Sequence, residues 1–395
     1  MSIIKINDGV YSVGVTNPAL RVFDIIMYAE YGTTYNAYLV KGEKTALIEI
    51  VHENFFDEYL ENINSVADIS KIDYLIVNHT EPDHTGSIIK LMNLNPDIQI
   101  YGTAAAGKCL AQIANMPLNF NVVKPQQQLD LGNGHVLEFC PSPFLHWPDS
   151  MFTIDKCNDI AFTCDFLGTH YCEPRMFDTK ICYKEKYIPA FRYYFDCIFG
   201  PFKPYVLEGL KKLSNYNPKV VCPSHGPILT ESISECMEKY KIWSTPCEKA
   251  TKQFVIVYAS CYGYTAALAS AAADAVEASG INVTLVDIVK FSPQEASQQL
   301  AKSDGFMIGT DTINRSAPKP IWDTLSFIDA INTSKPVGAF GSYGWSGEAV
   351  PQVKSRLEGL RFKFVDNGFK VLFRPTEDDL AAIQEYALSV ASAIK

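Results

Sequence analysis

The sequence predicts an α/β protein of two domains: an αββα sandwich in residues 1–250, followed by a doubly wound parallel sheet in residues 251–395. The chain has 395 residues, which is enough for two full cores. Short apolar runs and helical segments alternate through the second half, whereas strands outnumber helices in the first half. The 47% of hydrophobic and 20% of charged residues are ordinary for a globular protein.

In the second domain, five apolar, β-rich runs alternate with helical segments. Strands are expected at residues 254–260, 282–289, 305–311, 336–342 and 369–375. Helices are expected at residues 265–280, 292–303, 320–332 and 348–360, and from Thr376 to the end. Gly280 is placed to end the first helix, and Asp379, three residues after Thr376, suggests a capping box. Alternating strands and helices indicate a parallel, doubly wound sheet.

The first domain begins with strands and gains helices later. Strands are expected at residues 3–13, 19–26, 33–40, 44–50, 73–79, 98–102, 135–142, 151–155 and 159–165. Helices are expected at residues 54–66 and 86–94. Two sheets with helices outside them would form the αββα sandwich. The boundary between the domains is expected near residues 245–252, before the strand that includes Phe254.

Charge and cysteine content exclude several classes of protein. The net charge of −10 disfavours nucleic acid and anionic membranes as partners. The N-terminus shows no signal peptide, and no stretch approaches the roughly 18 apolar residues of a membrane span, so we expect a cytoplasmic protein. The 11 cysteines include no Cys-x-x-Cys pair. We therefore expect reduced thiols and no appended rubredoxin or zinc ribbon.

Histidines and carboxylates recur where apolar strands of the first domain end. The segment VNHTEPDHTG supplies the first four, and three more follow later strands, giving the set His79, Glu81, Asp83, His84, His146, Asp165 and His225. Imidazole suits iron or zinc, and hard carboxylates shift the preference towards iron or manganese. Three carboxylates suit two cations better than one, and a lone aspartate such as Asp165 can bridge two metals. The pattern therefore predicts a binuclear metal centre.

A different interpretation applies to each motif taken alone. The H-x-E-x-D-H segment by itself could be a polar loop that caps a helix, but the recurrence of ligand types at later strand ends argues against this. His84 is the least secure ligand. We expect His170 to support the site rather than bind metal, and His52 and His135 to be surface or structural residues.

Three loops of the second domain resemble parts of a flavin site. The turn after the first strand offers hydroxyl groups, a glycine and a helix N-terminus to a phosphate, in Ser260, Cys261, Tyr262, Gly263, Tyr264 and Thr265. The loops after the third and fourth strands carry Thr312, Ile313, Asn314, Ser342, Tyr343, Gly344, Trp345 and Gly347. Each loop alone could be a structural turn. Together they lie where doubly wound sheets bind ligands, and the lack of G-x-G-x-x-G favours FMN over a dinucleotide.

In combination, these motifs make the chain resemble the flavodiiron proteins over nearly its whole length. The resemblance implies a metallo-β-lactamase-like αββα domain followed by a flavodoxin-like domain, with FMN and two non-haem irons as cofactors. It implies that one iron is held by His79, Glu81 and His146. It also implies that Asp83 and His225 hold the other iron, with His84 as a variable ligand, and that Asp165 bridges the two.

Two further implications of the resemblance concern individual positions. Glu81 stands where zinc hydrolases of the same fold carry a histidine, which separates iron redox chemistry from zinc hydrolysis. Asp311 stands where the family often has proline. This difference would alter the stiffness of the loop but not its assignment.

The resemblance implies an oxidoreductase that reduces dioxygen to water, nitric oxide to nitrous oxide, or both, and the sequence does not separate these substrates. Without a rubredoxin module, the electrons would come from an external donor such as a rubredoxin-like protein, a flavin reductase or a reduced deazaflavin. A homodimer or homotetramer is expected. Two alternatives are a zinc-dependent hydrolase fused to a flavodoxin domain, and an electron carrier with a structural metal.

Overall fold

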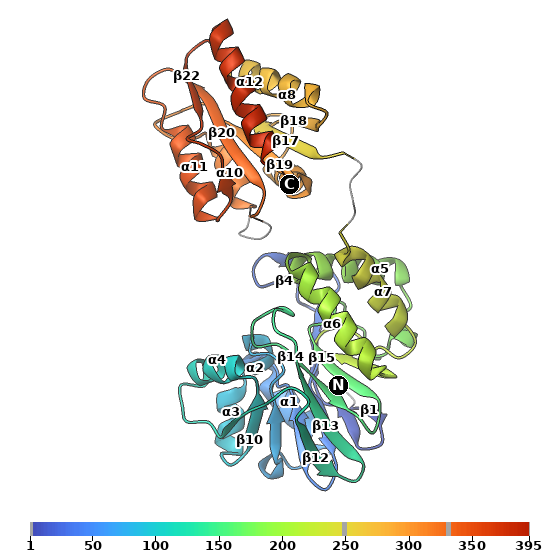
Figure 1. The fold of residues 1–395 in the computed structure, drawn as a ribbon. Coiled ribbons are helices and arrows are strands. Elements are labelled where there is room, and N and C mark those ends of the chain that lie inside the picture. The colour runs from blue at the N-terminus through green and yellow to red at the C-terminus, as the bar shows by residue number, and fades with distance from the viewer. Residues whose placement is uncertain (1–2, 247–250, 329–332, 395) are drawn as a thin grey trace. The chain divides into compact units, whose positions relative to one another are not determined.

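The computed structural model describes residues 3–246, 251–328 and 333–394, which form two compact units, Met1–Pro246 and Cys247–Lys395 (Figure 1). The predicted boundary between residues 250 and 251 borders on residues 247–250, which lie outside the described residues. No described helix is long and apolar enough to cross a membrane. The ten cysteines in the described ranges are all free thiols.

The first unit is built on two facing sheets. One has the strand order β1-β2-β7-β8-β9-β10-β11, with bounds Ile4–Asn7, Val10–Ser12, Tyr38–Lys41, Thr45–Ile48, Tyr74–Ile76, Gln99–Gly102 and Phe120–Val122. The other has the order β12-β13-β14-β15-β16, with bounds Gln128–Gly132, His135–Pro141, Met151–Asp155, Ile160–Cys164 and Val220–Pro223. Two short antiparallel pairs lie outside these sheets: β3 with β6 (Val15–Asn17, Thr33–Tyr35), and the hairpin of β4 with β5 (Val22–Phe23, Met27–Tyr28).

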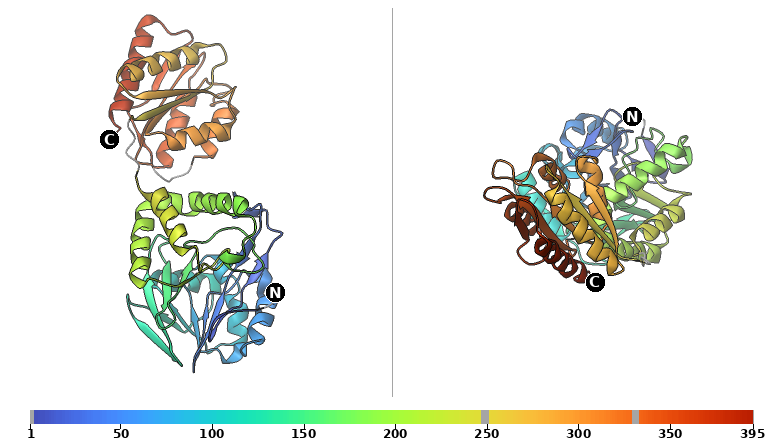
Figure 2. Two further views of the ribbon diagram at one scale, coloured as in Figure 1. Left: turned by 90° about the vertical axis from the view of Figure 1, so that its right-hand side faces the viewer. Right: turned by 90° about the horizontal axis from the view of Figure 1, so that it is seen from above.

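Helices cover the outer faces of these sheets, with α3 and α4 on one side and α6 and α7 on the other (Figures 1 and 2). The helices of this unit are α1 Phe56–Asn64, α2 Pro82–Thr85, α3 Ile88–Leu94, α4 Ala104–Ala114, α5 Lys184–Tyr194, α6 Lys203–Tyr216 and α7 Ile233–Ser244. Successive side chains of a strand point to opposite faces of its sheet, so the buried side chains fall into two clusters. In β7, Tyr38 and Val40 belong to the cluster between the sheets, and Leu39 belongs to the cluster beneath the helices. This confirms the predicted αββα sandwich.

Three predicted strands of this unit are wrong in detail. Residues 3–13 form an antiparallel hairpin that turns at Gly9 (φ +75°). Residues 19–26 do not form one strand, because the chain turns at Asp24 and Ile25, which both have positive φ, and strand β5 then pairs back on β4. Residues 33–40 divide between β6 and β7, which belong to different sheets. In each case a continuous β-rich run hides a turn.

The second unit contains one parallel sheet in the order β18-β17-β19-β20, with β22 and the short β21 both pairing with β20. The strands are β17 Gln253–Tyr258, β18 Asn282–Asp287, β19 Gly305–Gly309, β20 Pro336–Tyr343, β21 Lys363–Phe364 and β22 Phe369–Leu372. The helices are α8 Tyr264–Ala278, α9 Pro293–Lys302, α10 Lys319–Ser326, α11 Ala349–Gly359 and α12 Glu377–Ser392. The predicted doubly wound sheet is confirmed.

The two faces of this sheet carry separate helix layers. Helices α8 and α12 pack on one face, and α9, α10 and α11 pack on the other (Figure 1). The predicted capping box of Thr376 and Asp379 is present, and Gly280 follows α8 with φ +90°. The last part of the helix predicted at residues 320–332 falls on residues 329–332, outside the described residues.

Candidate functional site

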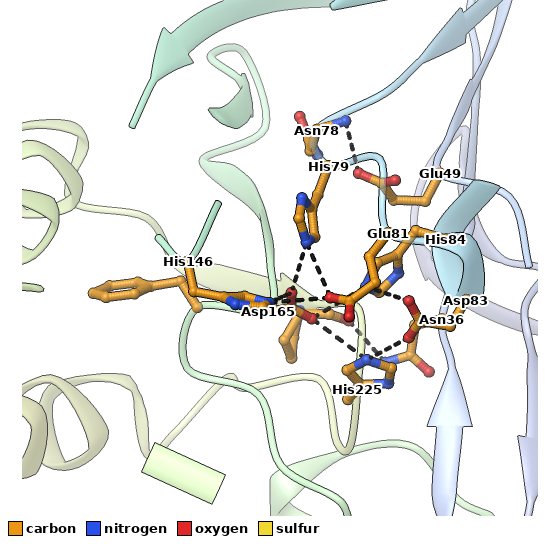
Figure 3. A network of polar contacts seen from close by, with 12 residues as sticks. Asn36, Glu49, Asn78, His79, Glu81, Asp83, His84, His146, Asp165 and His225 are labelled. Carbon is orange, nitrogen blue, oxygen red and sulfur yellow. Dashed lines mark hydrogen bonds and ion pairs between the residues drawn. The ribbon is translucent and has the colours of Figure 1, made fainter. Parts of the chain in front are cut away.

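Strand ends and one short helix bring the predicted metal ligands together. His79 follows β9, Asp165 follows β15 and His225 follows β16, while Asp83 and His84 lie on helix α2. The remaining two, Glu81 at the N-cap of α2 and His146 in the loop after β13, complete the group. Figure 3 shows that all seven side chains point towards one another. The sequence pattern therefore predicted a true spatial cluster.

The donor atoms fall into two neighbouring groups. His79, Glu81, His146 and Asp165 have ligand atoms within 4.8 Å of one another, and Asp83, His84 and His225 form a second such group. In the first group, Glu81 Oε2 lies 3.2 Å from His79 Nε2 and 3.1 Å from His146 Nε2. Each group therefore combines imidazole nitrogens with carboxylate oxygens, which is a donor set suited to iron.

Asp165 lies between the two groups and turns one oxygen to each. Its Oδ2 is 3.3 Å from His146 Nε2 and 3.7 Å from His79 Nε2. Its Oδ1 is 3.2 Å from His84 Nε2 and 3.4 Å from His225 Nε2. This division of one carboxylate between two sets of donors is the arrangement that a bridging ligand requires.

His84 belongs to the second group in this structure. Its Nε2 lies 3.5 Å from Asp83 Oδ1, and the side chain is buried. On the other side of Asp83, Oδ2 lies 3.1 Å from His225 Nε2. His84 is thus placed to bind one cation together with Asp83 and His225.

The hydrogen-bond pattern of the carboxylates fits cations better than a closed polar network. Both oxygens of Asp83 and Oδ2 of Asp165 are buried and form no hydrogen bond, although imidazole nitrogens lie close to them. Buried polar groups normally find hydrogen-bond partners. A carboxylate and an imidazole that lie close together without a hydrogen bond between them are expected where both point at a common cation.

Opposing charges dominate the electrostatics of the cluster. Burial alone would lower the pKa of His84, but the charges of Asp83 and Asp165 raise it to about 10. Burial alone would raise the pKa of Asp165, but His84 and His146 hold it well below its usual value. Without metal, these charges favour a protonated His84 beside an ionised Asp165, and binding of a metal to His84 would release its proton.

Two buried carboxylates that the sequence analysis did not identify support the cluster. Asp149 Oδ2 lies 3.1 Å from His79 Nδ1 and accepts hydrogen bonds from the backbone N–H and the hydroxyl of Thr80. Glu49 Oε1 accepts the N–H of Asn78. Asp149 thereby directs Nε2 of His79 towards Glu81 and Asp165. Asp149 lies three residues after His146 in the segment between β13 and β14, but no local signal pairs it with His79.

The turn of the β4–β5 hairpin brings another missed carboxylate to the cluster. Burial and the charge of Glu81 raise the pKa of Asp24 to about 6. The ring of Phe23, beside it, packs against that of His170 at a tilt of 35°, with 4.3 Å between ring centroids, and lies 5.6 Å from the ring of His225. This hairpin covers one side of the cluster.

The three remaining histidines have structural contacts. His170 Nδ1 lies 2.9 Å from Thr33 Oγ1, and its ring packs 5.0 Å from that of His225, outside both ligand groups. His52 Nδ1 accepts the N–H of Asn54. His135 Nδ1 pairs with Asp155 Oδ2 at 2.7 Å. These positions agree with the roles expected from the sequence.

In the second unit, the three predicted flavin loops meet at the carboxyl edge of the sheet. They line a cavity of about 240 Å³. Eight of the lining residues follow β17 or β19, and two lie at the end of β20. The eight are Cys261, Tyr262, Tyr264, Asp311, Thr312, Ile313, Asn314 and Arg315, and the two are Ser342 and Tyr343. Trp345 is 79% exposed, so its ring is available to a flat ligand.

Four of the predicted flavin residues, Ser260, Gly263, Thr265 and Gly347, belong to these loops but do not line the cavity. Ser260 Oγ accepts the N–H of Ala266, and Thr265 is fully buried. Gly263 has φ +82°, which favours glycine, and Gly347 lies against the ring of Tyr343. Arg315, Ser346 and Phe373 also line the cavity, although they are not among the residues predicted from the sequence. Phe373 follows β22, and its place at the same sheet edge was the available signal.

Comparisons with known proteins agree with this architecture. Residues 33–226, which include all seven clustered side chains, match the family described as ODP family beta lactamase, and residues 256–385 match Flavodoxin. Flavo-diiron protein FprA2 of Clostridium acetobutylicum is 49% identical over the whole of both chains. The chain belongs to the flavodiiron protein family. The family membership confirms the metallo-β-lactamase-like and flavodoxin-like domains.

Two other flavodiiron relatives show the extent of the similarity. Diflavin flavoprotein A 1 of Synechocystis is 36% identical over 89% of this chain, which spans 60% of that protein. The structure of rubredoxin oxygen:oxidoreductase from Desulfovibrio gigas shares 28% identity and a TM-score of 0.73, over 100% of this chain and 98% of that chain. As a flavodiiron protein, the chain is an oxidoreductase whose cofactors are FMN and a non-haem diiron centre. A zinc hydrolase is not favoured.

Proposed function

We propose that this flavodiiron protein reduces dioxygen to water, and that the same site also reduces nitric oxide to nitrous oxide. The observation that carries the proposal is the position of Asp165, whose two oxygens face two separate groups of donors. Two adjacent metals would supply open positions for one dioxygen molecule, or for the two nitric oxide molecules that one nitrous oxide requires. The similarity to rubredoxin oxygen:oxidoreductase supports dioxygen as a substrate.

The proposed ligand sets follow the two groups of donors. His79, Glu81 and His146 would hold one iron, and Asp83, His84 and His225 would hold the other. Asp165 would bridge them. Bound irons and FMN would supply the redox chemistry at these sites.

The protein's own residues orient the ligands and limit access of water. Asp149 fixes the orientation of His79 through Nδ1. Phe23 and Tyr194 are 7% and 2% exposed, and their rings lie 5.6 Å and 6.2 Å from the ring of His225. Such an apolar cover would exclude water from reduced metals while still admitting a small uncharged gas.

The FMN site of the proposal is the cavity at the carboxyl edge of the second sheet. The phosphate would bind at the turn of residues 260–265, next to the N-terminus of α8. The flavin ring would lie among residues 312–314 and 342–347, where Tyr343 and Trp345 offer aromatic faces. This placement rests on the meeting of three loops at one cavity.

Anaerobic stopped-flow of the reduced protein tests the proposed reaction. Mixing with dioxygen and, separately, with nitric oxide should reoxidise the flavin in a sample that contains about two irons and one FMN per chain. Rapid turnover of one gas alone would define the substrate. An electron carrier would show redox-active FMN without turnover of either gas, and zinc as the main metal in iron-rich medium would contradict the mechanism.

We also propose an electron donor, an oligomeric state and a cellular location for this protein. We expect a cytoplasmic homodimer or homotetramer that takes electrons from a rubredoxin-like protein, a flavin reductase or a reduced deazaflavin. Electron transfer requires the two cofactors to lie close together. A head-to-tail dimer would meet this need by placing the flavin of one subunit against the metals of the other, and two-fold dimers are the commonest oligomers.

Complementation between inactive variants tests this assembly. Asp165→Ala would lack a working metal site and Gly263→Val would lack a working flavin site. Subunit exchange between them should restore part of the oxygen reductase activity, because some dimers would pair an intact flavin with an intact metal site. A fully active monomer, or no recovery despite proven exchange, would contradict the head-to-tail dimer.

A further inference from the structure

The carboxylate of Asp311 occupies the turn in which the FMN phosphate is expected to bind. Asp311 Oδ2 accepts the backbone N–H of Cys261 at 2.5 Å, and Asp311 Oδ1 accepts a hydrogen bond from the hydroxyl of Thr265. Both donors belong to the turn of residues 260–265. A carboxylate and a phosphate are both anions that need such donors, so the protein already fills part of this turn with an anion of its own.

The hydroxyl of Thr265 has no capacity left for a second anion. Its oxygen accepts the backbone N–H of Ser342 at 3.1 Å, and its single proton is donated to Asp311. A phosphate oxygen can receive this proton only if the carboxylate of Asp311 releases it. Burial and the nearby Asp311 carboxylate also raise the pKa of the Cys261 thiol, in agreement with negative charge at this turn.

The backbone that carries Asp311 is held in place by close packing, whereas its side chain is held in the turn by hydrogen bonds. A Cβ atom added to Gly341 would lie 1.9 Å from the carbonyl oxygen of Thr310, so strand β20 packs closely against this loop. The hydroxyl of Thr310 bonds to the carbonyl oxygen of Asp311. Asp311 itself lines the cavity and is partly exposed. Rotation of its side chain could therefore vacate the turn without movement of the loop.

We propose that Asp311 competes with the phosphate group for this turn and thereby sets the affinity of the protein for FMN. The inference rests on the proposed position of the phosphate. When FMN binds, the carboxylate must give up the N–H of Cys261 and the hydroxyl of Thr265, and its charge remains close to the phosphate. Asp311 therefore weakens the binding of a flavin that carries a phosphate, and leaves unaffected the binding of a flavin that lacks one.

Flavin titrations of the full-length protein, stripped of flavin, test this role. Quenching of flavin fluorescence would give the Kd of FMN and of riboflavin for the wild type and for Asp311→Asn, which keeps the side-chain shape and removes the charge. Asp311→Asn should lower the Kd of FMN about tenfold, the equivalent of about 1.4 kcal/mol. It should leave the Kd of riboflavin unchanged. A second variant, Asp311→Ser, should also lower the Kd of FMN and leave the Kd of riboflavin unchanged.

Two further variants distinguish a wrong position of the phosphate from a wrong role of Asp311. Asp323→Asn makes the same change of charge on α10, where Asp323 pairs with Lys319 outside the cavity, and should change neither Kd. If Thr265→Val leaves the Kd of FMN unchanged, the phosphate binds elsewhere and the proposed flavin site is wrong. If Thr265→Val weakens FMN binding but neither Asp311 variant strengthens it, or if both flavins respond equally, the competition by Asp311 alone is refuted.

Discussion

Replacement of Asp149 by alanine should weaken iron binding although Asp149 is not placed to bind iron itself. One oxygen of this buried carboxylate contacts Nδ1 of His79 at 3.1 Å and accepts the N–H and the hydroxyl of Thr80 at 2.7 Å and 2.8 Å. Asp149→Ala removes all three contacts. His79 would then lose the partner that orients its ring, and the N–H of Thr80 would be left buried without its acceptor.

Loss of a group that orients a metal-binding histidine typically costs about 10- to 100-fold in metal affinity, or roughly 1.4 to 2.7 kcal/mol. The unsatisfied N–H of Thr80 should separately lower the free energy of unfolding of the metal-free protein by about 1 to 3 kcal/mol. FMN content should not change, because its proposed loops belong to the other unit.

The chain offers a matched control in Asp155. This aspartate is also fully buried and also pairs with a histidine, with Oδ2 2.7 Å from His135 Nδ1, but neither residue belongs to the metal cluster. Asp155→Ala should therefore lower stability without lowering iron affinity. Iron affinity would be measured by competition with a chelator, and stability by urea unfolding of the metal-free protein. Equal iron affinities of Asp149→Ala and Asp155→Ala would refute the reasoning.

Three other predictions follow from single contacts. Asp165→Ala should lose the bridge and most of the iron while FMN stays bound, as metal analysis and the flavin spectrum would show; loss of both cofactors together would mean that the units are not independent. Thr265→Val should weaken FMN binding by about tenfold and leave the iron content unchanged, because it removes one hydrogen-bond donor from the phosphate turn. Asp178→Ala should destabilise the first unit by about 3 kcal/mol at neutral pH, because the carboxylate accepts hydrogen bonds from Thr230 and Ser232.

The effect of Asp178 should also depend on pH in a defined direction. Burial alone would raise the pKa of Asp178, but the hydrogen bonds from Ser232 and Thr230 hold it below its usual value. A folded-state pKa that is lowered gives stability that is present above the unfolded pKa and lost as the pH falls through the folded pKa. The difference in unfolding free energy between wild type and Asp178→Ala should therefore shrink in acid. A constant difference between neutral and acidic pH would contradict this account.

The local pattern of the sequence determined most of the second unit. Strictly alternating strands and helices leave one arrangement, a parallel sheet, and its carboxyl edge necessarily gathers the loops that follow β17, β19 and β20. Capping at Thr376 and the glycine after α8 were local signals too, because they depend on backbone groups a few residues away. In the first unit, histidines and carboxylates that recur after apolar strands predicted seven side chains that the structure brings together.

Tertiary structure alone decided how these groups act on one another. The pairing of Asp149 with His79 joins residues 70 positions apart, and the division of the Asp165 oxygens between two groups depends on the meeting of two sheets. The turn at Asp24 and the contact of Asp311 with Cys261 are likewise set by packing, because neither residue carries a periodic signal of its own. Periodicity reports which face of an element is buried, whereas the partner of a buried polar group is chosen by contacts between segments that are distant along the chain.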